Sequence, residues 1–122
     1  MESTGLEHSK VINFNGIIEY STDGIISKQV IKKPTGNVTL FSFDRGQGLS
    51  EHTAPFDALV NVIEGEAVVM IDKKNYNLKA GEAIIMPAHV PHALSAPARF
   101  KMLLTMIKSL SLIHISEPTR PY

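Results

Sequence analysis

Short apolar runs recur along this chain roughly every ten residues, and they limit the folds open to it more than any other feature. Between Gly16 and Lys108 the runs are separated by Gly, Pro, Asn and Asp, and few windows keep a helical period. Many short strands with turn signals between them are typical of β-sandwiches and closed β-barrels, which cover or close their strand edges. The pattern therefore predicts an all-β domain with little helix.

The positions of the strands follow from this alternation and from the turn residues. We expect strands over residues 24–33, 37–45, 59–63, 66–71, 76–79, 83–86 and 100–108. The pair Glu64 and Gly65 is expected to break the chain between two of them. Residues two apart share one face of a strand, and the last run has an apolar residue at every second position. We expect one buried face from Phe100, Met102, Leu104 and Met106.

Size and charge restrict the partners of the protein. The chain has 122 residues, of which 43% are hydrophobic, and this suits one domain with a single core. Lys and Arg together number 12, as do Asp and Glu, so no basic field is available to hold nucleic acid or an anionic membrane. The absence of cysteine excludes disulfides and thiolate chemistry. A small molecule, a metal ion or a second copy of the chain is the expected partner.

The ends of the chain indicate location and domain limits. Residues 1–10 are polar and lack the apolar stretch of a secretory signal, and no run has the roughly 18 apolar residues of a membrane span, so we expect a cytoplasmic protein. We interpret residues 1–15 as an N-terminal extension and residues 16–109 as the domain. The codons for residues 110–122 can be chosen so that the resulting DNA resembles a transposon-end adapter used in preparing sequencing libraries. We therefore interpret residues 110–122 as a translated adapter, which removes His114 from the candidate ligands.

Two segments carry a specific spacing of glycine, histidine and proline. Residues 46–65 read GQGLSEHTAPFDALVNVIEG, and residues 81–92 read GEAIIMPAHVPH. They resemble the two motifs of the small single-domain cupins (cupin type-2), G-x5-H-x-H-x3-E-x6-G and G-x5-P-x-G-x2-H. The resemblance covers residues 16–108 and implies a double-stranded β-helix, or jelly-roll barrel. It also implies a homodimer paired through the sheets.

The histidine spacing has a physical reason. Because residues two apart share a strand face, an H-x-H pair and a carboxylate four residues further on can point into one barrel. In cupins these residues and the histidine of the second motif bind iron, manganese, zinc, nickel or copper. This chain keeps His52 and His92 but has Ala54 and Ala58 at the other two positions. Two imidazoles seldom hold a divalent ion tightly, so a metal would need a further ligand.

Asp57 and His89 are the nearest candidates for that ligand. Asp57 stands one residue before the glutamate position, so it should face the opposite side of the strand unless a bulge at Pro55 turns it back. His89 replaces the glycine of the second motif, on the loop beside His92. The alternative for both is a local role, in which Asp57 braces the turn and His89 faces solvent. The metal candidates are therefore His52, His92, Asp57 and His89.

Three functions fit these residues. The first is a binding module, favoured by the loss of two ligands, in which the barrel holds a small molecule whose polar group meets His52 and His92. The second is a metal-dependent dioxygenase or isomerase using divalent Fe, Mn, Ni, Cu or Zn. The third is a metal-free isomerase or epimerase with His52 as base. No nucleotide or organic cofactor is indicated. The predicted pocket lining is Phe56, Val60, Met70 and Met102.

Overall fold

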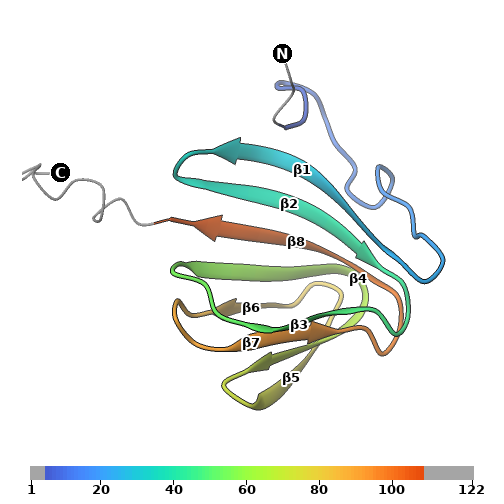
Figure 1. The fold of residues 1–122 in the computed structure, drawn as a ribbon. Helices are drawn as coiled ribbons and strands as arrows, with labels where there is room; N and C mark the ends of the chain where they lie inside the picture. Colours follow the sequence, from blue (N-terminus) through green and yellow to red (C-terminus); the bar gives the residue numbers. More distant parts are fainter. Residues whose placement is uncertain (1–4, 109–122) are drawn as a thin grey trace, which may run out of the picture.

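The computed structural model describes residues 5–108, and the adapter-like residues 110–122 lie outside this part of the chain. Residues 5–108 contain eight strands and no helix that could cross a membrane (Figure 1). The prediction of an all-β fold is confirmed. In chain order the strands are β1 (Ile25–Lys33), β2 (Gly36–Phe43), β3 (Gly48–His52), β4 (Asp57–Ile71), β5 (Lys74–Lys79), β6 (Ala83–Met86), β7 (His92–Ser95) and β8 (Phe100–Ile107).

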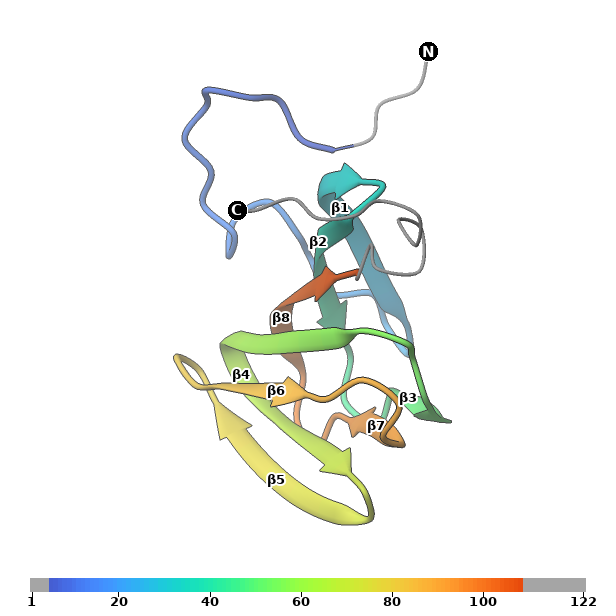
Figure 2. The ribbon, with the colours of Figure 1, turned by 90° about the vertical axis from the view of Figure 1, so that its left-hand side faces the viewer.

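The strands form two layers that are joined through β4. One sheet has the order β1-β2-β8-β4-β6, and the other has the order β3-β7-β4-β5; every pairing is antiparallel. The first part of β4 pairs with β8 and β6, and its last residues pair with β5 and β7. Figures 1 and 2 show how the layers curl over one another. This architecture confirms the predicted jelly-roll barrel.

The Glu64–Gly65 pair bends the chain without breaking it, so the prediction of two separate strands here is wrong. β4 continues through both residues for 15 residues in all. Its pairing with β8 shifts register between Val62 and Glu64, and Gly65 has a φ of 82°. A side chain on Gly65 would meet the carbonyl oxygen of Arg99. A β-bulge with glycine at a positive φ therefore redirects one long strand from the first sheet into the second.

The main core lies between the two sheets. The predicted face of β8 is confirmed, because Phe100, Met102 and Leu104 are buried and Met106 packs against them. The rings of Phe43 and Phe100 stack with centroids 4.6 Å apart. Burying an apolar side chain of this size contributes about 1.5–3 kcal/mol, so this cluster is a major source of stability. Its other buried members are Ala58, Val60, Val62, Ala67, Val69, Leu78, Met86, Leu94 and Ala96.

The segment before β1 packs on the outer face of the first sheet. A second buried cluster joins Ile18 of this segment to Val30 in β1 and Leu40 in β2. The side chain of Lys101 in β8 is buried, and its ammonium group donates a hydrogen bond to the carbonyl oxygen of Asn15 at 2.8 Å. The predicted N-terminal extension therefore contacts the sheet in part.

Two strands that the apolar pattern did not predict carry the candidate site. β3 has five residues and β7 has four, and most of β3 is exposed, so β3 has little apolar alternation to reveal it. Nearby, a two-residue turn at Asp72 and Lys73 joins β4 to β5. Asp72 and Lys73 have φ values of 50° and 68°, the pair of positive angles typical of a type I′ hairpin turn.

Candidate functional site

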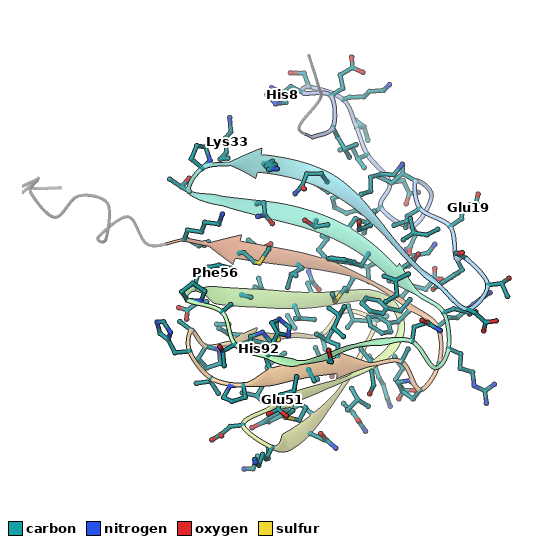
Figure 3. The ribbon with its side chains drawn as sticks, viewed as in Figure 1. His8, Glu19, Lys33, Glu51, Phe56 and His92 are labelled. Atoms are coloured by element: carbon teal, nitrogen blue, oxygen red, sulfur yellow. The ribbon has the colours of Figure 1, made fainter. Side chains whose placement is uncertain are left out.

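His52 and His92 lie side by side at one end of the barrel. His52 is the last residue of β3, His92 is the first residue of β7, and the two residues are partners in the register of these strands. Their ring centroids are 4.5 Å apart, with the ring planes at 72°. Figure 3 shows His92 at the same end of the molecule as Phe56. The structure thus brings the two motif histidines together.

A bulge in β3 turns His52 toward His92. Between Leu49 and His52 the strand has one residue more than β7 has between Leu94 and His92. Because strand side chains alternate, His52 would otherwise face away from the core against which Leu49 packs. The extra residue brings His52 to the same face as Leu94 and His92.

Both imidazoles are oriented by backbone carbonyl groups. The Nδ1 atom of His52 lies 2.8 Å from the carbonyl oxygen of Ser50, and the Nδ1 atom of His92 lies 3.0 Å from that of Val90. A carbonyl oxygen only accepts, so we assign the ring hydrogen of each neutral imidazole to Nδ1. Each Nε2 atom then keeps a lone pair that can accept a hydrogen bond or bind a cation.

The two rings differ in exposure. His92 is 3% exposed, whereas His52 is exposed to solvent. His92 therefore lies on the barrel side of the pair, and His52 lies on the solvent side. A ligand that approaches from solvent can reach His52 without any rearrangement.

The two substituted motif positions hold no alternative donor. Ala58 is 5% exposed and belongs to the inner core cluster, and Ala54 lies half-buried on the segment between β3 and β4. Within residues 5–108 no group of three or more His, Cys, Asp or Glu side chains is arranged to hold a metal ion. Zinc sites in proteins take three or four protein ligands, so the two histidines do not make a complete centre of this kind.

Asp57 and His89 lie apart from the histidine pair and contact each other's segments. Asp57 is exposed at the start of β4, and its Oδ1 atom accepts a hydrogen bond from the backbone N–H of Ala88 at 2.8 Å. His89 is exposed with a φ of 65°, and its backbone N–H donates to the carbonyl oxygen of Ala54 at 2.7 Å. The structure does not bring either side chain into a group with His52 and His92.

The four predicted pocket residues occupy different environments. Val60 and Met102 are fully buried in the core cluster, so side chains fill the barrel at their level. Phe56 is half-buried on the segment that leads into β4. Met70 is half-buried, and its Sδ atom accepts a hydrogen bond from the N–H of Lys73 at 3.1 Å. That these four residues line a pocket stays a prediction.

The contacts that sequence reasoning missed are backbone contacts. The carbonyl groups of Ser50 and Val90, which orient the imidazoles, and the N–H of Ala88, which binds Asp57, do not depend on side-chain identity. The one regularity visible in both cases is that each imidazole contacts the carbonyl group of the residue two positions earlier.

Two curled antiparallel sheets that share one long strand define the class of double-sheet jelly-roll proteins. The profile of the Cupin domain family matches residues 39–107. The chain therefore belongs to the cupin family, as the two motifs predicted. No curated protein shows a significant match to it.

Solved structures agree with this assignment. A conserved protein of unknown function from Streptococcus pyogenes is 35% identical, with a TM-score of 0.82, over 86% of this chain and 92% of that one. A cupin 2 conserved barrel domain protein from Leptotrichia buccalis is 40% identical, with a TM-score of 0.77, over 80% of this chain and 47% of that one. A cupin superfamily protein from Desulfitobacterium hafniense is 26% identical, with a TM-score of 0.78, over 88% and 97%.

Proposed function

We propose that this protein is a binding module that holds a small molecule at the mouth of the barrel, with the Nε2 atoms of His52 and His92 as its polar contacts. The observation that carries the proposal is the pair of Nδ1 contacts to the carbonyl groups of Ser50 and Val90. These contacts leave one acceptor nitrogen on each of two rings whose centroids are 4.5 Å apart. The complementary ligand carries hydrogen-bond donors, such as hydroxyl or amino groups.

A divalent metal ion is the second candidate ligand, and the same two Nε2 atoms favour it. His52 and His92 would hold the ion, and when bound it would act as a Lewis acid. The donor set supplies two protein ligands where catalytic zinc sites use three, so we expect weak binding of the ion alone. This shortfall favours the binding module over the metal-dependent dioxygenase or isomerase.

The test compares two histidine variants with a matched control. Metal content is measured by elemental mass spectrometry on tag-free protein purified without chelator. Ligand-detected NMR then screens small polyols, amino alcohols and carboxylic acids. His52→Ala and His92→Ala should abolish binding of the compounds that carry hydroxyl or amino donors. His8→Ala should not, because His8 is an exposed residue of the N-terminal segment.

Two outcomes would change the proposal. Near-stoichiometric iron, manganese, nickel, copper or zinc that His92→Ala removes would make the metal-dependent activity the leading candidate. Binding of screened compounds that persists unchanged in both histidine variants would place the ligand elsewhere. The homodimer and the cytoplasmic location, both expected from the sequence, remain proposals beside this one.

A further inference from the structure

The loop between β6 and β7, residues 87–91, is tied to the start of β4 at consecutive positions. Just before the loop, Met86 pairs with Ala58 of β4. The N–H of Ala88 then donates to Oδ1 of Asp57, and the N–H of His89 donates to the carbonyl oxygen of Ala54. The segment from residue 54 to residue 57 therefore holds two successive amides of the loop.

The far end of this loop forms the support of His92. The carbonyl oxygen of Pro91 accepts a hydrogen bond from the N–H of Asp72 at 2.9 Å, and the carbonyl oxygen of Val90 lies 3.0 Å from Nδ1 of His92. Between the two ends, His89 has a φ of 65°, a conformation that residues other than glycine adopt only when their surroundings hold it. The direction of the Val90 carbonyl thus depends on the bonds that anchor the loop.

We propose that Asp57 is a positioning residue, whose carboxylate anchors this loop so that the Val90 carbonyl holds the hydrogen of His92 on Nδ1 and leaves Nε2 for the ligand. The assignment rests on the proposed function of the histidine pair. It replaces a direct ligand role for Asp57 with a role through His92.

Two observations support positioning over ligation. Asp57 is exposed and is not grouped with the two histidines, yet its Oδ1 atom forms a bond of 2.8 Å to an amide 31 residues away in sequence. Within residues 5–108 its carboxylate has no Lys, Arg or His nitrogen at ion-pair distance. Its contact with the loop amide requires an acceptor oxygen and not a negative charge.

This distinction leads to a test with two substitutions at one position. Asp57→Asn keeps an acceptor oxygen, whereas Asp57→Ala removes it. The readout is the ring-nitrogen NMR spectrum of His92 at about pH 8.5, where imidazole in model peptides is neutral. In the wild type and in Asp57→Asn we expect separate Nδ1 and Nε2 signals typical of a single tautomer. In Asp57→Ala the two signals should move toward one another as the tautomers mix.

A control and a second probe make the test decisive. Glu51→Ala removes an exposed carboxylate beside His52 and should leave the His92 spectrum unchanged. Zn²⁺ serves as the probe for the pair itself, and its affinity should fall about tenfold in Asp57→Ala. If Asp57→Ala does not fold, Asp57→Leu keeps the bulk of the side chain without an acceptor.

Three results would overturn the assignment. A single His92 tautomer in Asp57→Ala, with only the melting temperature lowered, would show a purely structural role. Mixed tautomers in both Asp57→Asn and Asp57→Ala would show that an acceptor oxygen on the Ala88 amide does not hold the tautomer. A change in Glu51→Ala equal to that in Asp57→Ala would show a general surface effect. Failure of the wild type to bind Zn²⁺ or any screened compound counts against the proposed function and not against the tautomer result.

Discussion

The hydroxyl group of Tyr20 donates a hydrogen bond of 2.6 Å to the carboxylate of Glu64, joining the N-terminal segment to the bulge of β4. Burial raises the pKa of Tyr20, and the hydrogen bond to Glu64 and its negative charge raise it further. Tyr20 binds Oε2 of Glu64, and the ammonium group of Lys101 lies 3.7 Å from Oε1 of the same side chain. The segment is therefore attached by polar contacts as well as by its apolar side chains.

Tyr20→Phe should lower the free energy of unfolding by about 1.5 kcal/mol, because it removes a hydrogen bond to a charged group. The ring itself stays, and so does its contact with the Arg99 guanidinium, which lies 4.2 Å from the ring centroid. Urea denaturation measures the change. Tyr76→Phe is the matched control, since Tyr76 is 37% exposed. Equal effects of the two substitutions would show that the bond to Glu64 adds nothing.

His92→Ala should destabilise the protein far more than His52→Ala. His92 is 3% exposed, and its loss leaves the Val90 carbonyl without its donor, at a cost of about 2 kcal/mol. His52 is exposed, so its replacement should change stability by no more than about 0.5 kcal/mol. Thermal or urea unfolding measures both values. Similar losses in the two variants would contradict the inner and outer placement of the rings.

Gly65→Ala should destabilise the fold by more than about 1 kcal/mol beyond the effect of Gly81→Ala. Both glycines have a positive φ, of 82° and 93°, so both substitutions introduce backbone strain. A side chain at Gly65 would also meet the Arg99 carbonyl oxygen, whereas one at Gly81 would meet nothing within 4 Å. The difference between the two variants therefore measures the close approach at the bulge, and a difference of zero would contradict it.

Stability should fall at low pH partly through Asp44. Hydrogen bonds from the backbone N–H groups of Asp23 and Arg45, and the nearby charge of Arg99, lower the pKa of Asp44 below its ordinary value of 3.8. A carboxyl group whose pKa is lower in the folded state stabilises the fold above its unfolded pKa, and this is lost as pH falls through the folded value. Asp44→Asn should therefore flatten the dependence of melting temperature on pH below 3.8. An unchanged slope would refute this role, and Glu51→Gln, at an exposed carboxylate, is the control.

The predicted homodimer has a candidate surface on the outer face of the first sheet. Register partners link Ile31, Val38, Thr105, Leu59 and Ile85 into one row across its five strands. Three of these are exposed apolar residues, Ile31 at 48%, Leu59 at 38% and Ile85 at 60%. Leu59 and Ile85 are adjacent in register, and we propose that they form the centre of the association surface.

Leu59→Lys combined with Ile85→Lys should therefore convert a dimer into a monomer, as measured by light scattering. Val11→Lys, which changes a residue that is 98% exposed on the N-terminal segment, should leave the mass unchanged. A monomeric wild type would overturn the prediction of a dimer. A dimer that survives the double substitution would place the interface on another face.

The sequence was sufficient for the fold class, because alternation and turn residues are local signals. The alternating face of β8 followed directly from Phe100 to Met106. The continuity of β4 could not be predicted, because a bulge at Gly65 and a strand end use the same residue type. Most of β3 is exposed and it lacks an apolar alternation, so its boundaries could not be predicted from the sequence.

For the site, the spacing of the two motifs was enough to pair His52 with His92. It was not enough to assign Asp57, whose partner is a backbone amide 31 residues away and has no residue preference. Pro55 offered a reason for Asp57 to face inward through a bulge, but Asp57 is exposed and the bulge lies in β3, before His52. Long-range backbone contacts of this kind follow only from the three-dimensional arrangement.

The sharing of β4 between both sheets makes their stabilities interdependent. Four of the seven strand pairings within residues 5–108 involve this strand, so displacement of the whole of β4 removes pairings from both sheets. The barrel should therefore unfold in a single cooperative transition. In native-state hydrogen exchange, the amides of β4 should report the same opening free energy on both sides of Gly65, so that the two layers form one cooperative unit.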